Sequence, residues 1–337
     1  MAGRFDPLTR TAVRGGRTTV PQGQAAAGTP APPGAPAKPR VWTPDGPVDL
    51  GLILGPLRRG PADPTFRTTP DGSVWRASQT PQGPATLRVT QPSPGEAIHA
   101  EAWGPGADWM LGQLPSLLGA DDDPTVFVPR HRLVHASHRR RPGLRLTRTG
   151  LVLESLIPTI LEQKVTSDEA YRSWRRLVRQ YGEPAPGPQE LYVAPTARAW
   201  ALIPSWGWHK AGVDSKRSAT IVRAARVAHR VEEAAAMDLP QATARLEAIP
   251  GIGPWTSAET LQRSNGAPDA VTTGDLHLPG IVGYALIGER DTDDAAMLEL
   301  LAPYAGQRHR AARLILLAGH APPRRTPGMP RTDIARL

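Results

Sequence analysis

The pattern of apolar and polar positions divides the chain into a short alternating part and a longer helical part. Residues 86–90 and 97–103 alternate between apolar and polar side chains with a period of two, which is typical of half-buried strands. Pro70-Asp71-Gly72 predicts a turn, and a further strand follows it at residues 74–76. A helix is predicted at 107–118. Residues 41–127 are therefore expected to form a small α+β unit.

From residue 151 the apolar positions recur with helical spacing. The first helix is expected at 154–162. Thr166-x-x-Glu169 has the spacing of a capping box and predicts a helix that runs to Tyr181, before Gly182. The other predicted helices span residues 215–231, 240–248, 256–263, 278–287, 293–301 and 308–318. The fold class is α+β, with a mostly helical domain after the small α+β domain.

The composition of the two ends and of the central connector sets the expected domain boundaries. Residues 1–40 consist mainly of Arg, Gly, Thr, Ala, Gln and Pro, so they cannot bury enough apolar surface to fold and are expected to be disordered. The α+β domain and a basic connector would fill 41–148, the helical domain 149–322, and a flexible tail 323–337. The connector at 131–148 contains His138-Arg139-Arg140-Arg141, which suits either an exposed linker or a strip that contacts phosphates.

Composition also narrows the chemistry. The chain has no cysteine, which excludes disulfides, cysteine-bound zinc and iron–sulfur clusters. His131, His135 and His138 lack acidic companions at suitable positions, so no metal site is expected. There is no apolar run of 18 residues and no secretory leader, so we expect a cytoplasmic protein without a membrane span. The net charge of +9 favours a polyanionic partner.

The sharpest local signal is a glycine-containing turn between two predicted helices, at residues 246–263. Its centre reads Ile249-Pro250-Gly251-Ile252-Gly253, followed by Pro-Trp-Thr256. Glycine permits positive φ and lets a ligand approach the backbone closely. The turn leads into a helix N-terminus, where free N–H groups and the positive end of the helix dipole can bind a phosphate without reading base sequence.

Four segments give the chain a resemblance to the helix-hairpin-helix DNA glycosylases, of the 3-methyladenine DNA glycosylase II type and an actinobacterial branch. They are Ile-Leu-Glu-Gln-Lys-Val at 160–165, the hairpin at 249–256, Asp-Ala-Val-Thr-Thr-Gly-Asp at 269–275, and the last helix around 308–317. The resemblance covers roughly residues 151–320. It implies a monofunctional enzyme that binds double-stranded DNA, flips a damaged base out of the helix and hydrolyses its glycosidic bond, as a monomer and without a cofactor.

The resemblance also assigns a catalytic residue. An essential aspartate follows the hairpin glycines in this superfamily, and here that position is Asp275. Read from the residues alone, Asp275 suits an N-cap of the next helix equally well. Members that cleave the DNA strand carry a lysine two positions after the second glycine, where this chain has Trp255. No lyase activity is therefore expected, and Trp255 would stack on the flipped base or pack in the core.

The remaining candidates are weaker. Glu259 and Leu276 occupy positions where relatives often carry pocket aromatics, so Glu259 would either bond a base edge or face solvent. The wedge that fills the space left by the flipped base would come from Gln163 or Lys164, although Lys164 is equally suited to a phosphate contact. The other candidates are Trp206 and Trp208 for the pocket, or else for the core, and Thr256, Lys216 and Arg217 for DNA.

Two alternative functions stay open at this point. The substrate could be a deaminated or oxidised base rather than an alkylated purine, which Glu259 would suit. The chain could also be a non-catalytic hairpin module that only binds DNA, with Asp275 as a simple helix cap.

Overall fold

The computed structural model describes residues 39–93 and 95–323, so the predicted tails fall almost entirely outside the described residues. The first half carries a five-stranded antiparallel sheet with the strand order β1-β5-β4-β3-β2. Its strands are β1 (Arg40–Trp42), β2 (Phe66–Thr68), β3 (Val74–Thr80), β4 (Gly83–Thr90) and β5 (Ile98–Trp103). The strands predicted from the alternating pattern are confirmed, each within a few residues.

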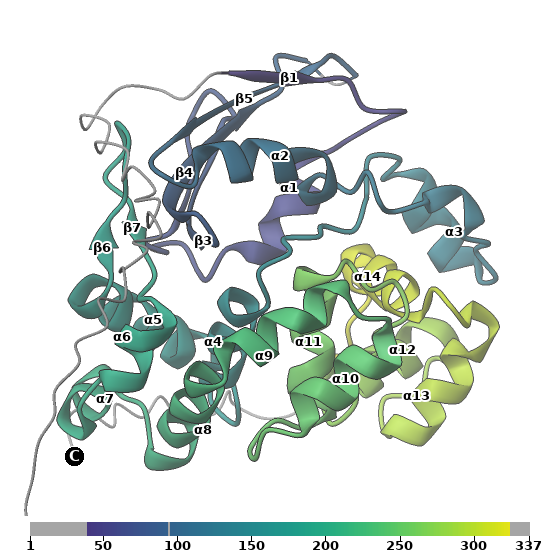
Figure 1. The fold of residues 1–337 in the computed structure, drawn as a ribbon. Helices are drawn as coiled ribbons and strands as arrows, with labels where there is room; N and C mark the ends of the chain where they lie inside the picture. Colours follow the sequence, from purple (N-terminus) through teal and green to yellow (C-terminus); the bar gives the residue numbers. More distant parts are fainter. Residues whose placement is uncertain (1–38, 94, 324–337) are drawn as a thin grey trace, which may run out of the picture. The chain divides into compact units, whose positions relative to one another are not determined.

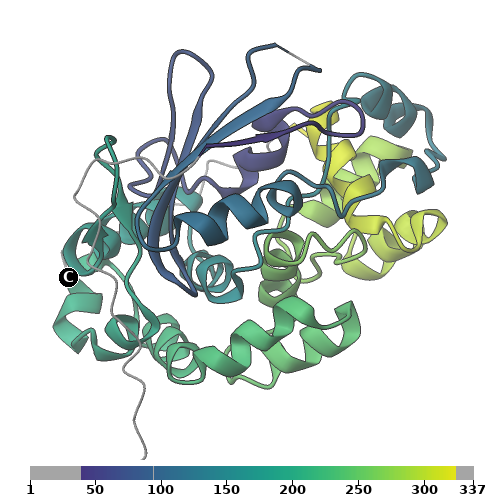
Figure 2. The same ribbon diagram turned by 45° about the horizontal axis from the view of Figure 1, so that its top comes forward.

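One face of this sheet packs on helices, which explains the alternation. Leu87, Val89 and Ile98 point into a core shared with α1 (Leu50–Leu54) and α2 (Ala107–Leu117). Figure 1 shows α2 lying along the sheet, and Figure 2 shows the same layer from a view turned by 45°.

The second half is helical apart from the short β6–β7 hairpin (Glu183–Pro184 and Tyr192–Val193), and from α8 onward its helices lie in one group away from the strands (Figures 1 and 2). Most of its buried side chains form one core around Leu156, Trp174 and Leu261. The helices are α4 (Val152–Leu161), α5 (Ser167–Tyr181), α6 (Ala197–Leu202), α7 (Ser205–Ala211), α8 (Ser215–Arg226), α9 (Ala228–Glu232), α10 (Leu239–Glu247), α11 (Pro254–Ser264), α12 (Leu278–Ile287), α13 (Asp294–Leu301) and α14 (Arg308–Ala318).

Local signals placed several helix ends correctly. The predicted capping box is present, because the Thr166 hydroxyl accepts from the Glu169 amide while the Glu169 carboxylate accepts from the Thr166 amide. The helices α12 and α14 have the predicted bounds, and both end at glycines in the left-handed conformation, Gly288 and Gly319.

The structure corrects one of the two interpretations of the connector, and it corrects one predicted helix. The connector at 131–148 is not simply an exposed linker, because it contains the helix α3 (Arg132–Arg139), whose Val134 is buried against the second half of the chain. The single helix predicted at 215–231 breaks at Val227 into α8 and α9. The break lets α9 place Glu232 where its carboxylate accepts from the Val152 and Leu153 amides at the start of α4.

Candidate functional site

The helix α11 places several side chains against the loop that carries Asp275. Trp255, Glu259 and Gln262 lie four and three positions apart, so they share one face of the helix. Each donates to or accepts from the segment 270–275: Gln262 donates to the Ala270 carbonyl at 2.8 Å and to the Thr272 hydroxyl at 2.8 Å. The helix that follows the hairpin therefore also holds the loop with the predicted catalytic residue.

Asp275 has both carboxylate oxygens engaged. Its Oδ2 accepts a hydrogen bond from the indole Nε1 of Trp255 at 3.0 Å. Its Oδ1 accepts from the backbone amides of His277 and Leu278, both at 2.8 Å, at the start of α12. The N-cap of α12 is His277, so Asp275 lies two residues before the N-cap rather than at it, although its side chain still binds the first amide of the helix. Three donors fix the orientation of this carboxylate at the end of a partly buried loop.

Glu259 forms a buried polar cluster one helical turn beyond Trp255. Its Oε1 accepts from the Thr272 hydroxyl at 2.7 Å, and its Oε2 pairs with Arg263 at 2.8 Å. Burial alone would raise the pKa of Glu259, but the Arg263 guanidinium and the Thr272 hydroxyl hold that pKa below its ordinary value. The carboxylate is therefore charged at neutral pH, and it does not face solvent freely, since its side chain is 19% exposed.

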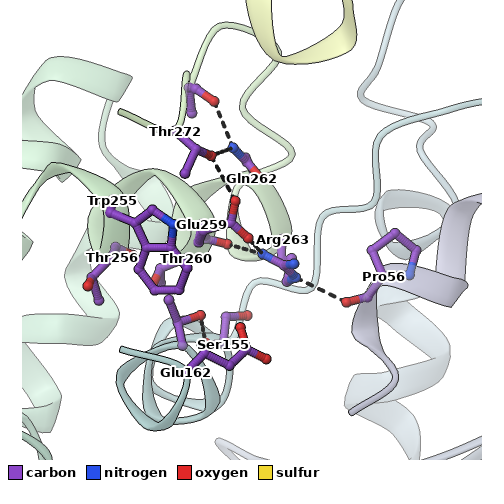
Figure 3. A network of polar contacts seen from close by, with 12 residues as sticks. Pro56, Ser155, Glu162, Trp255, Thr256, Glu259, Thr260, Gln262, Arg263 and Thr272 are labelled. Carbon is purple, nitrogen blue, oxygen red and sulfur yellow. Dashed lines mark hydrogen bonds and ion pairs between the residues drawn. The ribbon is translucent and has the colours of Figure 1, made fainter. Parts of the chain in front are cut away.

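Arg263 connects this cluster to the first half of the chain. Its Nε donates to the Pro56 carbonyl at 3.0 Å, while Glu259 and Glu162 raise the pKa of the guanidinium against the effect of burial. Figure 3 shows Trp255, Glu259 and Arg263 along α11, with Thr272 on one side and Pro56 on the other. The loop before α12 and the segment after α1 are thus joined through one ion pair.

The two hairpin glycines differ in conformation. Gly251 has φ of +99°, and a Cβ there would lie 2.2 Å from the Thr220 hydroxyl. Gly253 has φ of −121° in extended backbone, and a Cβ there would meet open space. The need for positive φ thus applies to Gly251 alone. Ile249 and Ile252 are buried as the predicted anchors.

The end of α4 lies beside the hairpin, as the Gln163-Lys164 motif suggested. The Gln163 amide donates to the Gly251 carbonyl at 3.0 Å and to the Thr256 hydroxyl at 2.8 Å. Thr256 is itself buried. Lys164 is exposed and, among the described non-glycine residues, is the one with positive φ, at +55°. A positive φ at a residue with a side chain costs about 1–3 kcal/mol, so this backbone is strained just after the end of α4.

Other predicted site residues lie elsewhere. Trp208 is 4% exposed and stacks on Trp200 in the core, so its proposed place in a base pocket is wrong. Arg217 is also buried, where it donates to the Leu161 carbonyl at 2.8 Å and pairs with Asp214, so it is not free to bind DNA. Trp206 is exposed on α7 under the Lys210 ammonium, away from α11.

Lys216 is exposed, as a DNA contact would require. Leu276, predicted for the base pocket, is 81% exposed next to Asp275 in the chain. The sequence reasoning missed Arg263, although its spacing of four from Glu259 is that of a helical ion pair. It also missed His309 on α14. Burial and the nearby Arg313 and Arg263 guanidinium groups lower the pKa of His309 well below its ordinary value.

Neither a metal cluster nor a membrane helix is found in the described part of the chain. No group of three or more His, Asp or Glu side chains there has the arrangement of a metal site. None of the helices between residues 39 and 323 has the length and apolar character needed to cross a bilayer.

Comparison with known proteins gives matches in sequence and in structure, although no protein-family model matches the chain. The chain is 30% identical over 222 residues, 62% of its length, to the probable bifunctional transcriptional activator/DNA repair enzyme AlkA of Mycobacterium tuberculosis, in two strains. The match covers 43% of that relative, so the chain spans less than half of its length.

The solved structures match over more of the chain. A 3-methyladenine DNA glycosylase from Archaeoglobus fulgidus superposes with a TM-score of 0.66 at 20% identity, covering 83% of this chain and 96% of that one. The 8-oxoguanine glycosylase/lyase of Clostridium acetobutylicum, solved with double-stranded DNA, gives 0.64 at 11% identity, covering 82% and 96%. The likeness reaches into the first half of the chain, because residues 149–337 make up little more than half of its length and the match covers 83%.

Proposed function

We propose that this chain, which has the fold of the helix-hairpin-helix DNA glycosylases, is a monofunctional glycosylase of base excision repair. The observation that carries the proposal is the hydrogen-bonded pair of Trp255 and Asp275, because it joins the hairpin helix to the carboxylate at the start of α12. A purely structural cap would need only the His277 and Leu278 amides. The indole bond in addition fixes the second carboxylate oxygen toward the hairpin side.

The reaction follows from these positions. The Gly251–Gly253 turn and the N-terminus of α11 bind phosphate oxygens of double-stranded DNA, and Gln163 ties the end of α4 to that turn. With the damaged nucleotide flipped out, cleavage of its glycosidic bond passes through an oxocarbenium-like sugar. The Asp275 carboxylate stabilises that cation and orients or deprotonates the attacking water.

Strand cleavage by a lyase step is not expected. The Schiff-base route requires a primary amine at the position of Trp255, and an indole has no nucleophilic amine. Trp255 instead acts on Asp275 through its N–H group, and the exposed part of its half-buried ring contacts the flipped base. We propose that the protein acts as a monomer in the cytoplasm, on DNA of the nucleoid.

An alkylated purine is the substrate class that the relatives' names favour. The probable DNA repair enzyme AlkA and the 3-methyladenine DNA glycosylase of Archaeoglobus fulgidus are the matches that support it. An N-alkylated purine is already electron-poor, so one carboxylate suffices and no general acid is needed to release the base.

A second candidate substrate is favoured by the Glu259–Arg263 pair. It lies one turn from Trp255, and its partly exposed side chains, Arg263 at 15% and Glu259 at 19%, place two charges near the pocket, where an apolar alkyl group would find no partner. A deaminated or oxidised base carries extra donors and acceptors on its edge, and those could bond to this pair.

A panel of duplexes tests the function, each with one alkylated, deaminated or oxidised base, scored for alkali-sensitive abasic sites. We expect release of one lesion class by the native chain, no release by Asp275→Asn, and nearly equal duplex affinity for both. Release by the purified Asn variant would contradict the role of Asp275. If no lesion is released while salt-dependent binding persists, the non-catalytic hairpin module is the better description.

A further inference from the structure

A basic hollow lies apart from the site described above. It has a volume of about 830 Å³ and lies between α3, the end of α14 and the second half of α12. Its charged lining residues are all basic, with no aspartate or glutamate among them. The basic residues are Arg130, His131, Arg132, His135, Arg140, Arg141 and His320. We call this surface the α3 hollow.

Three of the arginine side chains in the α3 hollow form no ion pair within the described residues. The side chains of Arg130, Arg132 and Arg140 are exposed, and none forms an ion pair with an acidic group within residues 39–93 and 95–323. Most other arginines on elements of the fold are engaged, such as Arg308 with Asp269. Unpaired guanidinium groups around one concave surface repel one another, and an anion that binds among them relieves this repulsion.

The floor of the hollow is fixed by hydrogen bonds. The Ser137 hydroxyl donates to the Leu314 carbonyl of α14 at 2.7 Å, and Arg141 donates to the Ser137 hydroxyl at 2.8 Å and to the Leu317 carbonyl. These bonds join α3 to α14, so the exposed arginines stand on a rigid base. A binding surface with a rigid base loses less entropy when a ligand orders its side chains.

We propose that the α3 hollow binds the phosphate backbone of duplex DNA, as a second contact outside the hairpin. Guanidinium groups bind phosphate oxygens with two parallel hydrogen bonds, and the hollow offers several of them without competing carboxylates. The helix α12 connects the two surfaces: Leu278 follows the Asp275 loop, and Ala285 lines the hollow seven residues later, about 10 Å along the helix axis.

A duplex fits these features better than an acidic peptide. The hollow is open to solvent, and its charges come from a helix face and from two loop ends, at Arg130 and His320, rather than from one linear strip. The inference rests on the proposed binding of DNA at the hairpin, but it does not depend on catalysis. A second contact at the α3 hollow would hold the DNA while the hairpin releases one site and moves to another.

The salt dependence of binding tests this surface. Affinity for an undamaged 30-base-pair duplex is measured between about 50 and 200 mM salt for the native chain and for Arg132→Gln/Arg140→Gln. The slope of log affinity against log salt is expected to become less steep by about one unit for each arginine. The matched control is Arg179→Gln/Arg198→Gln, which removes two exposed arginines from α5 and α6. If the slope of log affinity against log salt is the same for the native chain and for Arg132→Gln/Arg140→Gln, the proposal is overturned.

Cross-linking gives an independent readout, because the chain has no cysteine of its own. Arg140→Cys introduces one thiol in the hollow, and Arg198→Cys introduces one outside it. The duplex carries phosphate tethers activated as mixed disulfides, which an introduced thiol attacks with release of the small leaving thiol. We expect capture of this duplex at residue 140 but not at 198. Equal capture at both positions, or capture at neither, overturns the proposal. If Arg140→Cys captures the duplex as expected while the native chain releases no damaged base, the proposed catalytic function fails and the α3 hollow stands.

Discussion

Trp255 makes a contact that the sequence analysis did not predict. From its position in the sequence it was expected to replace a nucleophilic lysine and to stack on a flipped base or pack in the core. In the structure it is half-buried, and its N–H group donates to Asp275. The hydrogen bond forms because the loop at 270–275 folds back onto α11. No local sequence pattern predicts that contact.

Trp255→Phe keeps an aromatic ring and removes the bond to Asp275. A hydrogen bond to a charged group contributes about 1.5–3 kcal/mol, so if it is made mainly in the transition state the rate of base release falls by about ten- to a hundredfold. Single-turnover assays with saturating enzyme measure that rate directly. Trp206→Phe is the control. A rate loss of the same size in that variant would show that the effect does not come from the positioning of Asp275 by the Trp255 N–H group.

His309 gives a second prediction at this scale, because its lowered pKa makes stability depend on pH. The unfolded chain binds a proton at this histidine below about pH 6.5, whereas the folded chain does not, so the free energy of unfolding falls as the pH drops from 7 to 5. The loss can reach about 1.4 kcal/mol per pH unit.

In His309→Gln this dependence is expected to be weaker. Urea unfolding at pH 7 and pH 5 measures it in both chains, with the carboxylates outside their main titration range. Identical losses of stability in the native chain and the variant would show that His309 is not held neutral by its surroundings.

At the scale of elements, local chemistry explains what could be predicted. The capping box at Thr166 and the glycines after α12 and α14 are signals within a few residues, so those helix ends were correct. The helix α3 was missed because its stability comes from burying Val134 against α14, and its charged surface looks like a linker. The split of α8 from α9 depends on Glu232 reaching α4, a contact across 80 residues.

The site was predictable only in part for the same reason. The hairpin is a local motif, but Asp275 read alone is a helix cap, and the resemblance to a family was needed to single it out. Arg263 could have been found from its spacing to Glu259. Its bond to the Pro56 carbonyl could not, because that partner lies 207 residues away. Trp208 and Arg217 were misassigned because an aromatic or basic residue near a helix start can be buried as readily as exposed.

The hairpin offers a contrast between two substitutions of one kind. Gly251→Ala forces a Cβ into a left-handed backbone and onto Thr220, so we expect about 1–3 kcal/mol of destabilisation together with weaker DNA binding. Gly253→Ala meets no atom and needs no unusual φ, so stability should change by less than about 1 kcal/mol.

Measuring both DNA affinity and stability distinguishes Gly253→Ala from Gly251→Ala. At Gly253 the new methyl group stands at the start of α11, where a phosphate would approach, so binding is expected to weaken while thermal stability is kept. Fluorescence titrations with duplex DNA, alongside thermal melts, check both variants. Native affinity in a stable Gly253→Ala protein would argue against this helix N-terminus as the phosphate site.

At the scale of the whole molecule, the predicted boundary at 148/149 is crossed by many specific contacts. Arg59 pairs with Glu162 at 2.9 Å, the Trp174 indole donates to Asp63 at 3.0 Å, and the Tyr192 amide donates to the Pro64 carbonyl at 2.8 Å. The β6–β7 hairpin adds Leu191 and Val193 to a small apolar cluster with Trp75 and Trp103 of the sheet. These contacts lead to a prediction about independent folding.

A fragment of residues 149–323 is expected not to unfold cooperatively. Without the first half, Leu191 and Val193 lose the cover of Trp75 and Trp103, and the Trp174 indole loses its bond to Asp63. Each buried apolar side chain contributes about 1.5–3 kcal/mol, and a hydrogen bond to a charged group contributes a similar amount. Together this is comparable with the 5–15 kcal/mol by which a domain is usually stable. Near-ultraviolet circular dichroism through a urea titration distinguishes the outcomes, with residues 39–323 as the control that should unfold in one transition. A sharp transition of the fragment at the control's midpoint would make the helical part an autonomous domain, with the sheet as an addition to it.

If the fragment shows no such transition, the first half is part of the fold that positions Asp275. The contacts that connect them are the bond from Arg263 to the Pro56 carbonyl, the Arg263–Glu259 pair, and the bond from the Thr272 hydroxyl to Glu259.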